Sequence, residues 1–145
     1  MSPVRRDSDC FGHRRDQLRR RLKKEGLAGI LVTQTENVRY LTGFGGEDSY
    51  LLLWNEHEVL ISDSRFTEQI REECPGLDTH IRRTGVSLAQ AAVNLVNRAK
   101  LSSLGVEGSI SLATYDKIKA ATKQTELVRT EDWIEQMRAI KDKAE

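Results

Sequence analysis

Three short apolar runs in the first half of the chain predict the strands of a sheet. Residues Ala28 to Val32 are continuously apolar, which is typical of a strand buried on both faces. Tyr50–Trp54 and Val59–Ile61 follow, and the polar stretch Asn55-Glu56-His57-Glu58 between them predicts a hairpin. Weaker strands are predicted farther along the chain, at Thr79–Arg82, Leu104–Val106 and Leu127–Val128.

Apolar residues at helical spacing predict helices between these strands. Leu18 and Leu22 lie four residues apart within Arg14–Glu25, and Gly26 follows at a position where helices commonly end. Further helices are predicted from Asp63 or Ser64 to Pro75, over Leu88–Ala99, after a Ser111 cap and after a Thr130 cap. The last of these carries one apolar stripe, formed by Trp133, Met137, Ile140 and Ala144.

This alternation of elements predicts the fold class. Strands that alternate with helices need crossover connections, which favour parallel pairing, and the hairpin adds antiparallel pairing. We predict an α/β fold with a mixed, largely parallel sheet of about six strands and helices on both faces. Residues 1–13 are expected to be a flexible tail, 14–130 one domain, and 131–145 a helix leading towards a further domain. Because that helix lacks a stop signal, we expect the chain to be a fragment.

The segment Asn37–Gly46 contains an arginine, two aromatic residues and three glycines, whereas a simple connection needs only turn residues. Asn37 is predicted to cap a short helix over Val38–Thr42, which Gly43 ends. The structural interpretation is a tight turn with Tyr40 and Phe44 as lids on the core. The functional interpretation is a binding segment, because loops between rigid strands often carry binding groups.

A second candidate is the sequence Asp63-Ser64-Arg65-Phe66 at the predicted junction of strand and helix. Asp63 can cap the helix and form a local ion pair with Arg65, which is the structural interpretation. Glu47-Asp48, in the loop after the glycines, is a further pair of acids that can contact a partner.

Composition and motifs narrow the classes of function. The chain has 145 residues, of which 31% are charged, and a net charge of +1, which gives no argument for a nucleic-acid partner. No apolar run reaches membrane-spanning length, and the polar N-terminus is not a secretory signal. The two cysteines form no disulfide framework, which favours a cytoplasmic protein. The three histidines are scattered, and no nucleophile elbow or dinucleotide motif occurs, so we predict no metal and no catalytic site.

Four stretches together resemble a known family. NVRYLTGF, the strand YLLLW, the Asp63-Ser64-Arg65-Phe66 corner and the segment Met137–Asp142 are similar to the N-terminal domain of the creatinase, aminopeptidase P and prolidase family. The resemblance extends from about Arg14 to the end of the chain. It implies a sheet related to that of ribonuclease H, and a catalytic domain beyond this chain that holds two metal ions, such as manganese.

The resemblance also implies a role. In the family this domain supports oligomer formation and closes the active site of a neighbouring subunit, which limits substrates to short proline-containing peptides. The substrate or interface residues implied here are Asn37, Arg39, Tyr40, Phe44, Asp63 and Arg65. The parent is then an Xaa-Pro metallopeptidase, and this chain alone is inactive. The alternatives are a creatinase-type hydrolase and a non-catalytic binding protein, such as a histone-chaperone subunit.

Overall fold

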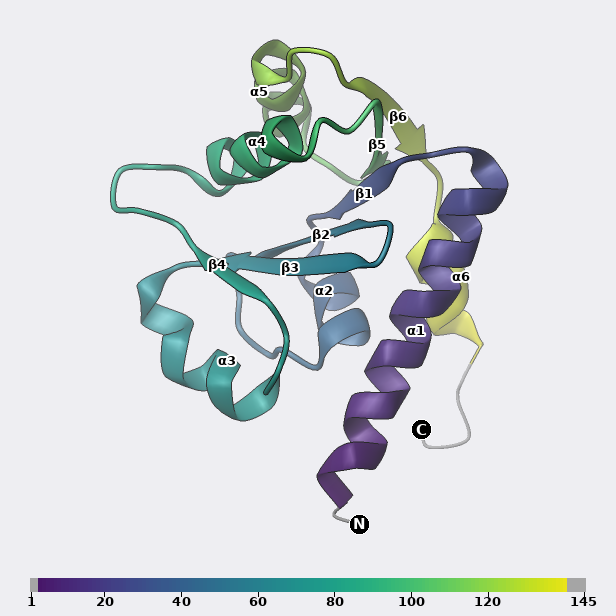
Figure 1. Ribbon diagram of the computed structural model, residues 1–145, viewed down its shortest axis with the longest axis vertical. Helices are drawn as coiled ribbons and strands as arrows, with labels where there is room; N and C mark the ends of the chain where they lie inside the picture. Colours follow the sequence, from purple (N-terminus) through teal and green to yellow (C-terminus); the bar gives the residue numbers. More distant parts are fainter. Residues whose placement is uncertain (1–2, 141–145) are drawn as a thin grey trace.

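The structure, a computed structural model, describes the backbone of residues 3–140 and the side chains of residues 10–140. Its centre is a six-stranded sheet in the order β4-β3-β2-β1-β5-β6 (Figure 1). The strands are β1 (Gly29–Val32), β2 (Tyr50–Trp54), β3 (His57–Ser62), β4 (Thr79–Ile81), β5 (Ser103–Glu107) and β6 (Glu126–Thr130). The helices are α1 (Pro3–Glu25), α2 (Thr35–Thr42), α3 (Thr67–Glu73), α4 (Leu88–Ala99), α5 (Leu112–Ala121) and α6 (Trp133–Ala139), with a 3₁₀ turn over Ser64–Phe66.

The pairing of the strands follows from the connections between them. The hairpin joins β2 and β3 in antiparallel fashion, and β1 also pairs with β2 in antiparallel fashion. The pairs β1–β5, β3–β4 and β5–β6 are parallel. The prediction of a mixed and mostly parallel six-stranded sheet is therefore confirmed.

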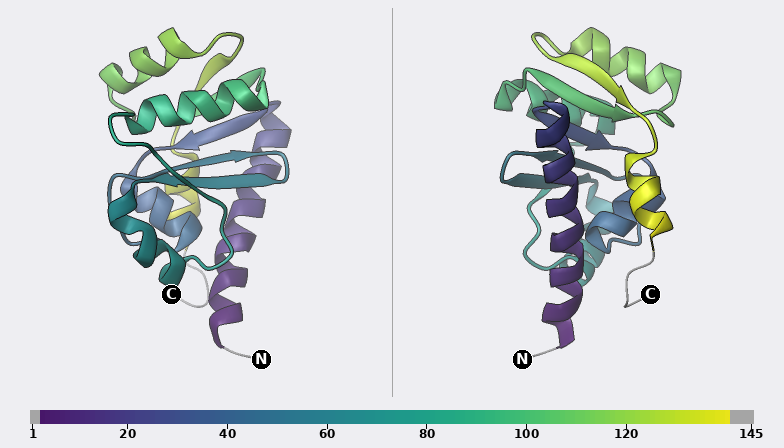
Figure 2. Two further views of the ribbon diagram at one scale, coloured as in Figure 1. Left: turned by 60° about the vertical axis from the view of Figure 1, so that its left-hand side comes forward. Right: turned by 90° about the vertical axis from the view of Figure 1, so that its right-hand side faces the viewer.

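Helices cover both faces of the sheet, as predicted (Figure 2). Ile30 and Val32 on β1 face the core beneath α1, α2, α3 and α6. Leu31, between them, faces the core beneath α4 and α5. This alternation explains why the strand reads as a continuous apolar run, since both of its faces exclude water.

The first helix is longer than predicted. Helix α1 begins at Pro3, whereas the sequence pattern predicted a start at Arg14 and a flexible tail before it. Phe11 supplies a physical reason, because its ring lies so close to Gly43 that a Cβ there would come within 2.7 Å of it. This contact attaches the early turns of α1 to the end of α2. Met1 and Ser2, also assigned to the tail, lie outside the described residues.

The last helix begins later than predicted. Thr130 belongs to β6, and α6 starts at Trp133 after Asp132, which adopts a left-handed conformation at φ 59°. Ile134 is buried against the sheet, and Trp133 and Met137 pack beside it. The predicted continuation over residues 141–145, including Ala144, lies outside the described residues.

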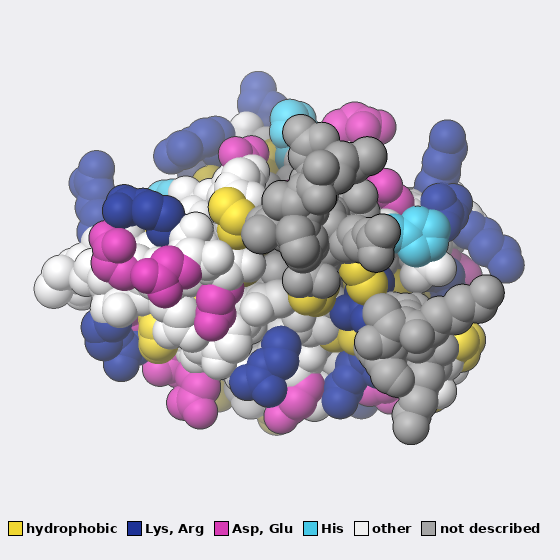
Figure 3. Space-filling view, turned by 90° about the horizontal axis from the view of Figure 1, so that it is seen from below, with side chains coloured by type: hydrophobic (Ala, Val, Ile, Leu, Met, Phe, Trp, Pro, Cys, Tyr) yellow, Lys and Arg dark blue, Asp and Glu magenta, His cyan; other side chains and the backbone are white. Residues whose placement is uncertain are grey.

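The surface is charged and mixed in sign. On the face shown in Figure 3, basic and acidic side chains are interspersed, and hydrophobic side chains appear as small separate areas. Part of the basic charge on α1 is neutralised, because both Arg15 and Arg19 form ion pairs with Glu58 on β3. Within residues 3–140, each helix is too short or too polar to cross a lipid bilayer.

Candidate functional site

The six residues proposed from the sequence fall into two separate places. Asn37, Arg39 and Tyr40 lie on α2, and Phe44 follows shortly after it. Asp63 and Arg65 lie where β3 ends. Two polar groupings result. The Asn37 cluster consists of Gln34, Asn37, Glu107, Glu135 and Arg138, and the Asp63 corner consists of Asp48, Asp63, Arg65 and Arg82.

Asn37 is not a helix cap, contrary to the sequence prediction. Helix α2 already begins at Thr35, so Asn37 lies in its first turn, and its side chain is fully buried. Its Nδ2 donates to Oε2 of Glu107 at 2.5 Å and to Oε2 of Glu135 at 3.1 Å. Oε1 of Gln34 is also within reach, at 3.0 Å. An amide group has two hydrogens for these three acceptors, so its donor capacity is fully used.

Glu107 holds the start of α2 against the end of β5. This residue is 3% exposed, and its Oε1 accepts hydrogen bonds from the backbone N–H groups of Thr33 at 2.6 Å and Gln34 at 2.9 Å. Burial raises the pKa of Glu107, and these N–H donors partly offset the rise. Glu107 was not among the residues predicted from the sequence, although an acid directly after the apolar run Leu104–Val106 marks the end of a buried strand.

Arg138 connects the same cluster to α6. Its Nη1 donates to Oδ1 of Asn37 at 3.0 Å, and the hydroxyl of Tyr40 donates to the carbonyl of Met137 at 3.2 Å. Together with the bond from Asn37 to Glu135, three hydrogen bonds therefore join α2 to α6. We assign the Asn37 cluster a structural role, because it joins β5, α2 and α6 and its polar atoms are occupied by one another.

The two remaining residues of α2 differ in how accessible they are. Tyr40 is half-buried, with the guanidinium carbon of Arg14 4.0 Å from the centre of its ring. Arg39 is exposed, and its Nη2 donates to the carbonyl of Gly45 at 3.3 Å. Of the two, Arg39 has the charged group that a partner can reach.

Phe44 cannot form the apolar wall that the family resemblance suggested. Its side chain is 0% exposed and makes an edge-to-face contact with Phe66, with ring centres 5.6 Å apart. A Cβ at Gly46 would come within 2.3 Å of the Phe44 ring, so only glycine permits this approach. The structural interpretation, a residue that closes the core, fits this placement.

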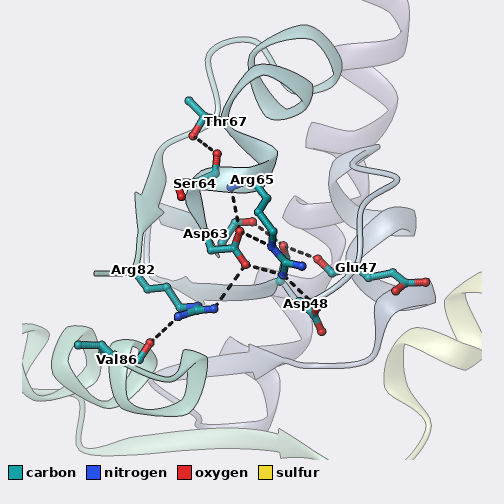
Figure 4. A network of polar contacts seen from close by, with 10 residues as sticks. Glu47, Asp48, Asp63, Ser64, Arg65, Thr67, Arg82 and Val86 are labelled. Carbon is teal, nitrogen blue, oxygen red and sulfur yellow. Dashed lines mark hydrogen bonds and ion pairs between the residues drawn. The ribbon is translucent and has the colours of Figure 1, made fainter. Parts of the chain in front are cut away.

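The Asp63 corner contains the cap and ion pair expected from the sequence (Figure 4). Oδ1 of Asp63 accepts hydrogen bonds from the backbone N–H of Arg65 at 2.9 Å and from its Nε at 3.0 Å. Oδ2 accepts from Nη2 of Arg65 at 2.7 Å, which completes a two-pronged pairing. Arg82 approaches Oδ2 of Asp63 at 3.5 Å, and Asp48 lies 3.2 Å from Nη2 of Arg65.

The electrostatics of this corner favour the charged forms of both partners. Hydrogen bonds from Arg65 lower the pKa of Asp63 to about 2, and the same contacts raise the pKa of Arg65. The side chain of Asp63 is 8% exposed, whereas that of Arg65 is 62% exposed. A guanidinium is therefore held in a fixed orientation at the surface, where a carboxylate or a carbonyl oxygen can meet it.

Neither grouping resembles a metal centre. Among the residues that the structure describes, no group of three or more His, Cys, Asp or Glu side chains is arranged to hold a metal ion. Arg65 lies across both acids of the Asp63 corner, and Asn37 lies between the two acids of the buried cluster. Both groupings present charged and hydrogen-bonding side chains.

The known proteins that this chain is similar to are described as peptidases. The peptidase YqhT of Bacillus subtilis (strain 168), itself uncharacterized, is 32% identical over 131 residues, which are 90% of this chain and 36% of that protein. The N-terminal domain of the cytoplasmic peptidase PepQ from Mycobacterium tuberculosis H37Rv superposes with a TM-score of 0.80 at 31% identity, covering 87% of this chain and 98% of that one. An Xaa-Pro aminopeptidase structure from Streptococcus pyogenes gives a TM-score of 0.81 at 28% identity, covering 90% and 99%.

The extent of these matches identifies the kind of domain. This chain spans little more than a third of the length of the curated relative, yet it spans nearly all of the two solved structures. The sequence pattern of the Creatinase/Prolidase N-terminal domain matches residues 14–140, which include all six strands of the sheet. The chain therefore belongs to the creatinase/prolidase N-terminal domain family.

Proposed function

We propose that this chain is the non-catalytic N-terminal domain of a metal-dependent Xaa-Pro dipeptidase or aminopeptidase. In this proposal it supports oligomer formation and closes the active site of a partner subunit. The peptidase relatives support it, as does the family match over residues 14–140. The parent would be cytoplasmic, as the M. tuberculosis relative is described to be, and would act on short proline-containing peptides.

The observation that carries the proposal is the exposed guanidinium of Arg65. Asp63 fixes its orientation through both carboxylate oxygens, and yet most of its surface remains open. A pre-oriented cation loses little conformational freedom when it meets an anionic or carbonyl group of a partner. Arg39, which is also exposed, is the second candidate for contact with a peptide carboxylate or an interface acid.

The catalytic chemistry would reside in the further domain of the parent. A pair of divalent metal ions, manganese or similar, would activate the attacking water there. The described residues of this chain supply no ligand set for such ions. The proposed contributions of this chain are to exclude long substrates from the site and to position Arg65 and Arg39 at the subunit interface.

The test uses the complete parent protein, assayed on Xaa-Pro dipeptides and longer Xaa-Pro peptides with added manganese. We expect cleavage by the parent and none by the 145-residue chain alone. In the parent, Arg65→Ala is expected to lower kcat/KM by about tenfold or more, or to weaken the oligomer measured by sedimentation velocity.

Arg71→Ala is the matched control, because Arg71 is an exposed arginine on α3 that pairs with its helical neighbour Glu68. It should leave kcat/KM and the oligomer unchanged. Unchanged activity and assembly in both variants would overturn the interface role. A parent without peptidase activity would overturn the enzymatic role and leave a creatinase-type hydrolase or a binding protein.

A further inference from the structure

A hollow of about 580 Å³ lies beside the Asp63 corner, between the loop that enters α4 and the first turns of α5. Its walls include Tyr50 at the start of β2, Arg82 and Val86 before α4, and Lys117 on α5. Pockets for small organic molecules in proteins span roughly 300–1,000 Å³. The size of this hollow therefore suits a small molecule.

Two positive groups from different elements meet in this hollow. Nη1 of Arg82 donates to the carbonyl of Val86 at 2.9 Å, and Nζ of Lys117 donates to Oγ of Ser87 at 2.9 Å. The guanidinium and the ammonium therefore bind two consecutive residues, Val86 and Ser87. The contact between Arg82 and Val86 is visible in Figure 4.

The acids nearby are already engaged. Both carboxylate oxygens of Asp63 are bound by Arg65, and Asp48, which also lines the hollow, lies 3.2 Å from Arg65. Among the described residues, Lys117 has no acidic partner. Nε of Arg82 is buried, without a hydrogen-bond partner in the same part of the chain. Since Asp63 also pairs with Nη2 of Arg82 at 3.5 Å, the positive charge that no acid of the described residues neutralises here is that of Lys117.

The remaining walls define the other half of a ligand. Val86, Leu88 and Ala113 present apolar surface, and Tyr50 presents a phenol. A phenol is protonated at neutral pH and can donate a hydrogen bond, and burial raises the pKa of Tyr50 further. Mostly apolar walls with a few converging polar groups are typical of small-molecule sites.

We propose that this hollow binds a small organic acid, with its carboxylate between Arg82 and Lys117 and its apolar part against Val86, Leu88 and Ala113. This inference does not depend on the proposed function, since it concerns a different surface and needs no catalytic domain.

The test is a titration of the ¹⁵N-labelled 145-residue chain with N-acetyl-leucine. Binding is monitored by NMR through the chemical shifts of the backbone amides. We expect saturable shifts confined to residues 86–89 and 113–117, with a roughly millimolar Kd. N-acetyl-leucine amide, which has the same apolar group without the carboxylate, should give no saturation. Lys117→Gln should raise the Kd by about fivefold or more.

Lys119→Gln is the matched control, since Lys119 is an exposed lysine of the same helix whose ammonium lies over the ring of Tyr115. It should leave the Kd within a factor of about two. Ala113→Phe, at an exposed position, should abolish binding by filling the hollow, and the dispersion of each spectrum reports whether the variant is folded. Equal binding of the amide, equal effects of the two lysine substitutions, or shifts spread over other basic surfaces would each overturn the proposal.

Discussion

Nη1 of Arg138 lies 3.0 Å from Oδ1 of Asn37, although 101 positions separate the two residues in the sequence. One belongs to the NVRYLTGF segment and the other to the helix that ends the described chain. Two of the four stretches that resemble the family are therefore physical neighbours. Glu107 accepts a hydrogen bond from Nδ2 of the same Asn37 amide.

We expect Arg138→Met to lower the free energy of unfolding by about 1–3 kcal/mol, because Oδ1 of the buried Asn37 loses its donor. Urea unfolding followed by circular dichroism measures this change. Arg98→Met, at an exposed position on α4, is the control and should alter stability by about 0.5 kcal/mol or less. Equal losses in the two variants would show that the hydrogen bond to Asn37 contributes nothing.

Asp63 should make stability depend on acid pH. Its pKa falls from an ordinary 3.8 to about 2 in the folded protein, so its stabilising effect is complete above pH 4 and is lost as the pH falls towards 2. Asp63→Asn should therefore be less stable than the native chain at pH 6, and the difference should shrink at pH 3. Asp78→Asn, at an exposed position, is the control. A difference that stays constant between pH 6 and pH 3 would contradict the lowered pKa.

Comparing Gly43→Ala with Gly26→Ala distinguishes the cost of backbone strain from the cost of a steric clash. Both have positive φ, 81° and 73°, but a Cβ at Gly43 would meet the Phe11 ring at 2.7 Å, whereas one at Gly26 would meet nothing within 4 Å. Gly26→Ala should cost about 1–2 kcal/mol of stability from its left-handed conformation alone. Gly43→Ala should cost about 1–3 kcal/mol more, because the Phe11 ring must shift from its place. The stability of both variants is measured by thermal or urea unfolding. An equal loss of stability in the two would mean that Phe11 does not pack closely against Gly43.

Cys74 should react slowly with thiol reagents. It is buried, its Sγ lies 3.4 Å from the carbonyl oxygen of Thr42, and burial raises its pKa to about 11. At pH 8, we expect Ellman's reagent to modify Cys74 only after the chain has unfolded. Cys10→Ser isolates this thiol, and the same variant in 6 M guanidinium chloride gives the rate for an accessible one. Comparable rates under the two conditions would contradict the raised pKa and the burial.

The fold was predictable from the sequence because its strands are short, apolar and separated by clear helical patterns. The run Ala28 to Val32 indicated a strand covered on both faces, and the structure has one there. The hairpin between β2 and β3 followed from the polar residues at its tip. The start of α1 was missed because Phe11 is one apolar residue in a polar stretch, and its partner Gly43 is distant in sequence.

The candidate site was predictable only where its contacts are local. Asp63 and Arg65 are two residues apart, so their pairing could be inferred from the sequence alone. Asn37 was misassigned as a cap because its partners, Glu107 and Arg138, lie 70 and 101 positions away. Phe44 was proposed to line a peptide site, but its burial depends on Phe66 and Gly46, which no local pattern places against it.

The order of strands in the sheet has a consequence for the kinetics of folding. Strands β1, β2 and β3 each pair with the next strand in the chain, and the paired residues are at most 25 positions apart (54 − 29 = 25, for Gly29 and Trp54). Strand β5 must return to β1, and Glu107 at its end meets Thr33 across 74 positions, a closure that costs more entropy. We therefore expect β1 to β4 to assemble before β5 arrives, so that losing the Glu107 contacts accelerates unfolding and leaves the refolding rate nearly unchanged.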